Sequence, residues 1–417
     1  MKTGLVLTGG GARAAYQVGV LQAIAAVRAG LGLRGGNPLP IITGTSAGAI
    51  NAVALASGAD DFDGSVAMLA GVWERFRAEQ VYRSDSLGVI RSGARWLTML
   101  SLGWALARLR KVRPRSLLDN APLGELLTRL VDPPRLRRMM REGHLDAIAV
   151  TASSYGSGLH VTFYDAATPV VPWTRSQRIA VPAAIGVPHL LASSAIPFLF
   201  PAVALDIAGD GAAEPRPEFC GDGSMRQAAP ISAAVHLGAE RILVVGAGRM
   251  HEQPLPRAGS AEYPTVAQVA GHALSSIFLD ALAVDIERLQ RINATLALLP
   301  ESARRETTLR PIETLVIAPS ERLDDIAARH VGELPPAIRA LLAGIGVSGR
   351  AGDPRGAALA SYLLFESAYT RELMALGYRD TMARGNEVLD FFGWHAAPGG
   401  GRPKPPAGIS APASSPP

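Results

Sequence analysis

Apolar positions at the start of the chain form two short runs, each followed by glycines and then by a longer, lightly charged segment. The short runs cover 5–7 and 39–43, and the longer alanine-rich segments cover 14–27 and 49–56. A short apolar run that ends at turn residues is typical of a buried strand, whereas a longer run with few charges suits a buried helix. The pattern therefore predicts two strand–turn–helix units in direct succession.

Further strand-like runs recur at 147–152, 159–163, 242–245 and 314–317, with helix-length segments between many of them, one of them over 230–237. Alternating strands and helices are typical of a parallel sheet whose two faces are both covered, because each crossover helix packs back onto the sheet. We therefore expect an α/β fold with a mainly parallel central sheet.

The pattern changes character toward the C-terminus. From about residue 321 it becomes helical, with one amphipathic candidate helix over 356–374. Residues 397–417 are rich in Pro, Gly, Ser and Ala and have almost no large apolar side chains, so we expect that tail to be disordered. The predicted organisation is a main domain over 1–320, a helical appendage packed on it over 321–396, and the tail.

Composition excludes several classes of protein. The chain has 417 residues, 48% hydrophobic and 18% charged, which is ample material for a core and excludes general disorder. The single cysteine, Cys220, excludes an intrachain disulfide framework and favours a reducing compartment. The net charge of +5 permits weak attraction to anionic lipid or nucleic acid, but zinc-ligand spacing and the aromatic–basic pattern of RNA-binding proteins are both missing. We expect no metal, no nucleic-acid partner and, without a secretory signal pattern, a cytoplasmic location.

Residues 44–48, Gly-Thr-Ser-Ala-Gly, fit the pattern G-x-S-x-G between a predicted strand and a predicted helix. The chain must reverse sharply there so that the Ser46 side chain projects outward, and a Cβ at Gly44 or Gly48 would crowd the neighbouring elements. The N-terminus of the following helix favours negative charge that develops at the serine. The pattern predicts that Ser46 is a nucleophile, and a plain glycine-rich turn is the alternative.

A second glycine cluster lies between the first predicted strand and its helix. It consists of Gly9, Gly10, Gly11, Ala12 and Arg13. Backbone N–H groups that converge in such a loop hold either the oxyanion of a tetrahedral intermediate or a phosphate, as in dinucleotide-binding folds. The phosphate interpretation fails because no Asp or Glu occurs between residues 13 and 59 to bind a ribose, and no Lys-Ser/Thr pair follows the glycines. We therefore predict an oxyanion hole, with a tight turn without function as the alternative.

A serine hydroxyl is a weak nucleophile until a neighbouring base takes its proton. Asp222 is the best candidate, because Gly221 and Gly223 on either side let its backbone approach another loop closely. An ordinary Asp-Gly turn is the alternative. The rival arrangement is a Ser-His-Asp triad, for which His236 follows Asp222 in a predicted helix. The histidines available to it are those at 144, 160, 189, 236, 251, 272, 330 and 395.

These motifs together resemble the patatin-like phospholipases, over about residues 3–250. The order matches: the loop Gly9-Gly-Gly-Ala-Arg13, then Gly44-Thr-Ser-Ala-Gly48, then Asp222-Gly223. The segment Ala192-Ser-Ser-Ala-Ile-Pro197 is also similar to a segment of that family, as is the block over 222–230. Two positions depart from the family pattern, Ser224 where Gly or Ala is frequent and Ala14 where Gly is usual.

The resemblance implies a three-layer α/β/α fold and a Ser–Asp dyad without histidine or metal. Ser46 would attack the ester carbonyl while Asp222 accepts its proton, and N–H groups near 10–12 would hold the oxyanion. Arg13 would either fix that loop or contact a lipid phosphate. The implied substrates are phospholipids or other acyl lipids. A small-ester hydrolase with a Ser-His-Asp triad, or a non-catalytic lipid-binding or nucleotide-binding protein, are the alternatives.

Two charged segments remain. Residues 87–115 combine Trp and Leu with Arg, and their uncharged stretch is too short to span a bilayer. They predict either a core-packed helix with a solvated basic end or an interfacial helix, which would make the protein peripheral at the inner membrane face. Residues 60–64, Asp-Asp-Phe-Asp-Gly, lack the spacing of a calcium loop and predict a solvated acidic turn.

Overall fold

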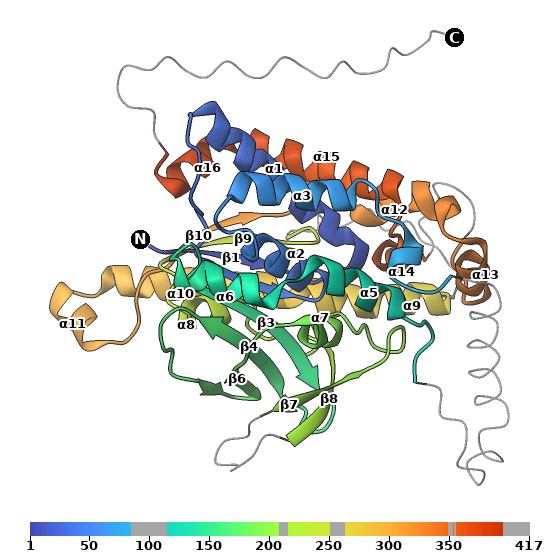
Figure 1. Ribbon diagram of the computed structural model, residues 1–417, viewed down its shortest axis with the longest axis horizontal. Helices are drawn as coiled ribbons and strands as arrows, with labels where there is room; N and C mark the ends of the chain where they lie inside the picture. The colour runs from blue at the N-terminus through green and yellow to red at the C-terminus, as the bar shows by residue number, and fades with distance from the viewer. Residues whose placement is uncertain (85–114, 208–215, 251–262, 349–352, 354–355, 395–417) are drawn as a thin grey trace.

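A ten-stranded sheet forms the centre of the computed structural model, which describes residues 1–84, 115–207, 216–250, 263–348, 353 and 356–394 (Figure 1). The strands are β1 (Thr3–Leu7), β2 (Ile41–Thr45), β3 (Ala147–Ser154), β4 (His160–Ala166), β5 (Thr174–Arg175), β6 (Arg178–Pro182), β7 (Val203–Ile207), β8 (Arg216–Asp222), β9 (Arg241–Val245) and β10 (Glu313–Ile317).

The strand order separates the sheet into two regions. From β10 through β9, β1 and β2 to β3 every neighbouring pair is parallel. Beyond β3 the pairing becomes mixed, because β4 and β8 both run antiparallel to β3. The mainly parallel central sheet predicted from the sequence is therefore confirmed, and it carries an antiparallel extension at one side.

Helices occupy the connections between the strands. They are α1 (Ala15–Gly30), α2 (Ala47–Ala56), α3 (Phe62–Trp73), α5 (Ala121–Leu130), α6 (Pro133–Arg141), α7 (Val187–Ser193), α8 (Ser232–His236), α9 (Val266–Ser275), α10 (Ala281–Leu298), α11 (Glu301–Glu306), α12 (Leu323–His330), α13 (Pro336–Gly344), α14 (Ala357–Leu363), α15 (Ser367–Ala383) and α16 (Gly385–Phe392).

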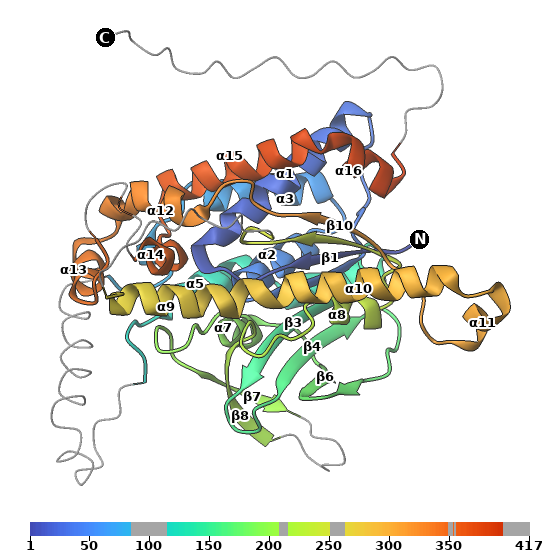
Figure 2. The same cartoon turned by 180° about the vertical axis from the view of Figure 1, so that it is seen from behind.

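The two faces of the sheet bury two separate cores, because successive residues of a strand point to opposite sides. Leu5, Ile42 and Leu243 belong to the larger core, which includes side chains of α1, α2, α3 and α15. Val6, Ile41 and Ile242 belong to the smaller core, with side chains of α8 and α10. The views from front and back show these helices on opposite sides of the strands (Figures 1 and 2). The protein is thus a three-layer α/β/α structure, as predicted.

Helix α15, near the C-terminus, lies along α1 on the outer side of the larger core (Figure 2). Glycines permit this close approach: a Cβ at Gly19 would lie 1.9 Å from the carbonyl oxygen of Met374, and one at Gly377 would lie 2.2 Å from that of Tyr16. Any larger residue at either position would force the two helices apart. The domain boundary expected near residue 320 stays a prediction.

The single helix expected over 356–374 is wrong, because α14 ends at Leu363 and α15 begins at Ser367. The carbonyl of Leu363 accepts hydrogen bonds from the Tyr82 hydroxyl at 2.8 Å and from the Phe365 amide at 2.9 Å. Phe365 also packs its ring against Trp73 and Phe76. These contacts come from distant parts of the chain, so the local apolar pattern could not indicate the break.

Other boundaries shift by smaller amounts. Strand β2 begins at Ile41 rather than at 39, because Pro40 has no N–H to donate to a neighbouring strand. The helix expected over 230–237 is shorter and begins at Ser232. Strands β5 to β8 were not predicted. Each mixes buried residues with exposed ones or, in β5, is exposed throughout, so no clean apolar run marks them.

One helical run in the described chain, Val266–Leu298, is long and apolar enough to cross a membrane by length and composition alone. It comprises α9, a π-helical turn at Ser276–Asp280, and α10. Leu282 and Ile286 of α10 belong to the smaller core, and the buried Asp285 carboxylate accepts the Ile231 amide at 3.0 Å. Helix α10 therefore packs on that face of the sheet (Figure 2), whereas Ala267 and Leu274 of α9 belong to the larger core.

Two further expectations concern segments outside the described residues and the acidic run over 60–64. Segments 87–114 and 397–417, together with His251 and His395, lie outside the described residues, so the interfacial helix and the disordered tail stay predictions. The acidic run over 60–64 begins α3: Asp61 accepts the Gly64 amide as the helix cap, and Asp60 pairs with Arg135 at 3.2 Å.

Candidate active site

Ser46 occupies a sharp turn between β2, which ends at Thr45, and α2, which begins at Ala47. Its backbone has φ 55° and ψ −131°, a conformation that a residue with a side chain rarely adopts. A Cβ at Gly44 would lie 2.5 Å from the Gly48 carbonyl oxygen, and one at Gly48 would lie 2.4 Å from the carbonyls of Leu7 and Thr8. Both glycines of the motif are thus required for this turn to fit between β1 and α2.

The hydroxyl of Ser46 donates a hydrogen bond of 2.7 Å to Oδ2 of Asp222. Asp222 is the last residue of β8, which pairs with β3 beside β2, so the sheet itself brings the two side chains together. Both residues are buried, with exposed fractions of 1% for Ser46 and 0% for Asp222. The other carboxylate oxygen accepts the backbone amide of Ser224 at 2.8 Å, which fixes the orientation of the carboxylate.

Burial raises the pKa of Asp222 to about 6, because a desolvated carboxylate resists ionisation, while the hydrogen bonds from Ser46 and Ser224 lower it. At neutral pH the group is therefore ionised, yet it is a stronger base than an ordinary aspartate. A pKa close to the working pH is the property that general-base catalysis requires.

The glycine loop lies directly beside this pair. The loop lies so close to Ser224 that a side chain at Gly9 has no room, because a Cβ there would lie 2.3 Å from Oγ of Ser224. Gly11 has φ 56° and borders the same cavity as Ser46. Among the described residues, the turn and loop hydrogen bonds do not use the amides of residues 9–12 as donors. The assignment of these N–H groups to an oxyanion hole stays a prediction.

Arg13 points away from this cavity. Its side chain is 3% exposed, and the guanidinium contacts Asp324 of α12 at 2.5 Å and Ser361 of α14 at 2.7 Å. The guanidinium carbon also lies 4.1 Å from the centre of the Tyr362 ring. Of the two roles considered for Arg13, these contacts favour fixing the loop over contacting a lipid phosphate.

Residues 193–195, at the end of α7, contact both Ser46 and the strand end that carries Asp222. The Ser46 amide donates to Oγ of Ser193 at 2.8 Å, and the Gly223 amide donates to the Ser193 carbonyl at 3.1 Å. The Asp222 amide donates to the Ala195 carbonyl at 3.0 Å. The sequence comparison with the family marked residues 192–197 but did not predict a role for them. The structure shows that it joins the nucleophile turn to the turn that carries the carboxylate.

Replacing Ser193 by Ala is expected to lower kcat about tenfold, because the strained Ser46 turn loses the one side chain that accepts its amide. The matched control is Ser65→Ala on α3, since that hydroxyl donates to the Gly58 carbonyl and Ser65 does not border the cavity beside Ser46. Steady-state kinetics on a soluble ester would compare the two variants. Equal effects on kcat would show that Ser193 does not orient the nucleophile.

An apolar cavity borders Ser46, and the space between its lining atoms, with open solvent included, is about 760 Å³. It follows α2 past Ile50 to Ala54 and is bounded by side chains of α3 and α5, among them Trp73 and Leu127. Phe365, between α14 and α15, closes another part of its wall. A cavity with this lining suits a hydrocarbon chain rather than a polar group.

Histidine does not take part in the pair, as far as the described residues extend. Nε2 of His160 lies 3.1 Å from the Gly223 carbonyl, and burial lowers the pKa of this ring to about 4, so the neutral ring donates its N–H there. His236 stacks on Trp173, which belongs to the smaller core. No described histidine is hydrogen-bonded to Ser46 or Asp222, and the described residues contain no cluster of potential metal ligands.

A serine in a strained strand–helix turn, bonded to a buried carboxylate at the edge of an α/β/α sheet, has the geometry that nucleophilic serine catalysis requires. The sequence profile of the patatin-like phospholipases matches residues 5–235. The chain therefore belongs to the patatin-like phospholipase family.

Two solved structures show distant similarity. VipD from Legionella pneumophila is 16% identical with a TM-score of 0.29, and the alignment covers 93% of this chain and 67% of that one. Human GIVD cytosolic phospholipase A2, in complex with methyl gamma-linolenyl fluorophosphonate and terbium chloride, is 13% identical with a TM-score of 0.38. That alignment covers 94% of this chain and 59% of the human one. No curated protein sequence matches significantly.

Proposed function

We propose that the protein is a serine lipid acyl hydrolase that cleaves carboxylic ester bonds through a Ser46–Asp222 dyad. The observation that carries the proposal is the 2.7 Å hydrogen bond between the Ser46 hydroxyl and the Asp222 carboxylate at the end of an apolar cavity. Family membership supports a lipid acyl hydrolase in general, and the residues of the site supply a specific mechanism.

In the first half of the reaction, Asp222 accepts the hydroxyl proton of Ser46 as Oγ bonds to the ester carbonyl carbon. The carbonyl π electrons move to oxygen, and the N–H groups of residues 10–12 stabilise that oxyanion. Protonated Asp222 then gives its proton to the leaving alcohol oxygen as the ester C–O bond breaks. This step leaves an acyl group on Ser46.

The second half repeats these proton transfers with water. Asp222 takes a proton from water as the water oxygen attacks the acyl carbonyl, and it returns the proton to Oγ of Ser46 as the fatty acid leaves. The same carboxylate is therefore base and acid in turn. Its pKa of about 6 suits both roles near neutral pH.

The apolar cavity supports a long acyl chain as the group that Ser46 receives. Ser46 and Ala54 are eight positions apart, so the part of the cavity along α2 extends roughly 12 Å at the rise of an α-helix. Burial of methylene groups along this path contributes binding free energy of about 0.8 kcal/mol each. Short esters would not fill the path and would gain less.

A panel of ester substrates tests the proposed function. The full chain would be incubated with phosphatidylcholine, a lysophospholipid, a triacylglycerol and a short-chain nitrophenyl ester, and released fatty acid would be measured. We expect release from at least one long-chain lipid. Hydrolysis of the short ester alone would contradict the proposal and favour a small-ester hydrolase.

Replacing Ala54 by Phe is expected to shorten the preferred acyl chain, because the added ring fills the cavity two helical turns beyond Ser46. The ratio of kcat/KM for long over short esters should fall about tenfold. Ala67→Phe on α3 is the matched control, since Ala67 is exposed and does not border the cavity. An unchanged ratio in Ala54→Phe would mean that the acyl chain lies elsewhere.

A further inference from the structure

The side chain of Arg13 is enclosed by residues far along the chain. Its Nη2 contacts Oδ1 of Asp324 at 2.5 Å and the Ala358 carbonyl at 3.2 Å, and its Nε donates to Oγ of Ser361 at 2.7 Å. Asp324 belongs to α12, and the other two belong to α14. A buried guanidinium with this many fixed partners holds its own backbone in place.

The same helices also contact the backbone of the glycine loop. A Cβ at Gly11 would lie 2.3 Å from the Tyr362 carbonyl oxygen of α14, so the loop and that helix are in direct backbone contact. The Tyr362 ring meanwhile covers the Arg13 guanidinium. The loop that we assign to the oxyanion, residues 10–12, therefore lies between the nucleophile turn and the C-terminal helices.

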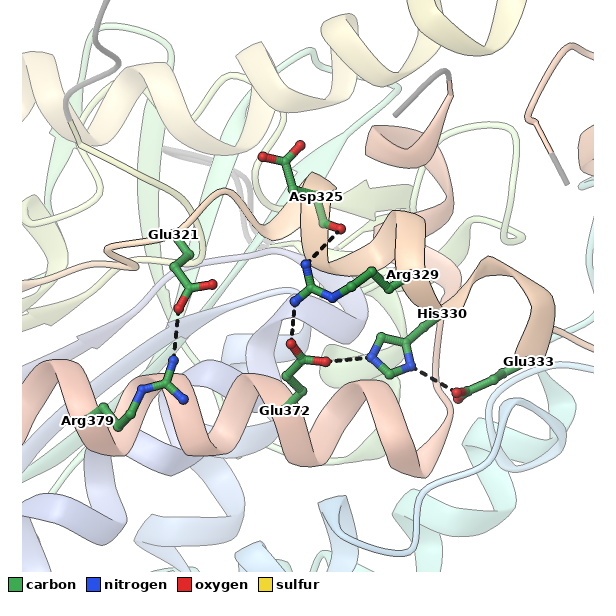
Figure 3. A network of polar contacts seen from close by, with 7 residues as sticks. All are labelled: Glu321, Asp325, Arg329, His330, Glu333, Glu372 and Arg379. Atoms are coloured by element: carbon green, nitrogen blue, oxygen red, sulfur yellow. Dashed lines mark hydrogen bonds and ion pairs between the residues drawn. The ribbon is translucent and has the colours of Figure 1, made fainter. Parts of the chain in front are cut away.

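Helix α12 is itself held from its other end. His330 lies 2.6 Å from the Glu372 carboxylate of α15 and 2.8 Å from Glu333, and Arg329 pairs with Glu372 as well (Figure 3). Glu321, just before α12, pairs with Arg379 of α15 at 2.8 Å. Figure 3 shows these contacts joining α12 to the long α15 helix. Asp324 thus projects from a helix that is anchored at both ends.

We infer that Asp324 is a positioning residue for the oxyanion loop and acts on the reaction through Arg13. This inference rests on the proposed function. Asp324 lies outside residues 5–235, the range that the family profile matches, and the inference gives it a role in positioning the site. The C-terminal helices then set the direction of the loop N–H groups relative to Ser46, in addition to packing on the core.

Asp324→Asn removes the negative charge beside the buried Arg13 while keeping the shape of the side chain. We expect kcat to fall roughly ten- to a hundred-fold, because small displacements of catalytic groups have effects of that size. The KM for a long-chain ester should stay within about twofold, since the cavity that we assign to the acyl chain has no side chain from α12. The labelling rate of Ser46 by a fluorophosphonate should fall in parallel with kcat.

Asp325→Asn is the matched control. Asp325 is the next residue on α12, its side chain is 56% exposed, and its ion-pair partner is Arg322 rather than Arg13. We expect wild-type kinetics from this variant. Thermal unfolding of both variants separates loss of the fold from loss of position, because a merely structural role would lower the melting temperature without changing kcat at a temperature where the protein is folded.

A second variant keeps the inference testable if Asp324→Asn does not fold. Ser361→Ala removes the hydrogen bond to Nε of Arg13, together with the bond from the Ser361 hydroxyl to the Ala358 carbonyl one turn earlier in α14. We expect kcat to fall about threefold or more with KM unchanged. Wild-type kcat in folded Asp324→Asn, wild-type kcat in Ser361→Ala, or an equal loss in Asp325→Asn would each overturn the inference. Activity that persists in Ser46→Ala would instead overturn the proposed function.

Discussion

Ser46→Ala is expected to abolish ester hydrolysis, with kcat reduced roughly 10⁵-fold or more. Alanine cannot form the acyl-enzyme, and the carboxylate of Asp222 then has no hydroxyl to deprotonate. Oxyanion stabilisation and substrate binding alone would leave only a small residual rate. Release of fatty acid from the best substrate of the panel, followed over hours at high enzyme concentration, would measure the loss.

The matched control for this variant is Ser57→Ala. Ser57 follows the other end of α2, and its hydroxyl donates only to the Val53 carbonyl at 2.7 Å. Wild-type activity in Ser57→Ala together with loss in Ser46→Ala would assign the effect to the nucleophile. If Ser46→Ala kept full lipid binding and full biological function, a non-catalytic lipid-binding protein would be the better description.

Asp222→Asn is expected to lower kcat by roughly 10³- to 10⁴-fold, because asparagine keeps the shape of the carboxylate but cannot accept a proton. In the wild type, kcat/KM should fall as pH drops below about 6, since protonated Asp222 cannot act as a base. The residual activity of Asp222→Asn should lack that acidic limb. A pH profile of both proteins on a soluble ester makes the comparison, and an unchanged limb in the variant would assign the titration to another group.

The same substitution should stabilise the fold at high pH. The pKa of Asp222 is about 6 in the folded protein and about 3.9 in an unfolded chain, so protonation favours the folded state. This stabilisation is fully present below pH 4 and is lost as pH rises through about 6. Asparagine avoids the loss, so at pH 8 the free energy of unfolding of Asp222→Asn should exceed that of the wild type by up to about 3 kcal/mol. The variant should therefore melt at a higher temperature at pH 8, and the difference should shrink near pH 4.

The sequence predicted the first two strand–turn–helix units and the parallel sheet because these elements are marked by local patterns. Glycines at 44 and 48 lie on either side of Ser46, and the structure explains both through backbone contacts that no other residue allows. Asp222 was weaker as a prediction, since an Asp-Gly pair is an ordinary turn. The structure places its carboxylate 2.7 Å from the Ser46 hydroxyl because β8 pairs with β3.

Other parts of the site depend on contacts between distant residues and had no local signal. Ser193 looks like any serine near a helix end, yet it accepts the amide of Ser46, 147 positions away. Asp324 is one of two adjacent acidic residues, and only the fold decides which of them meets Arg13. The break between α14 and α15 likewise follows from Tyr82 and Phe365 packing, which no window of sequence contains.

The central claim is that Asp222 takes the hydroxyl proton of Ser46 directly, without a histidine between them. The measurement that tests it most directly is covalent labelling by a fluorophosphonate, with the modified residue identified by peptide mass spectrometry in wild type, Ser46→Ala, Asp222→Asn and a set of single His→Ala variants. We predict rapid labelling of the wild type at Ser46, no labelling of Ser46→Ala, slow labelling of Asp222→Asn, and labelling of every histidine variant that folds. Wild-type labelling of Asp222→Asn, or its loss in one folded histidine variant, would contradict the dyad.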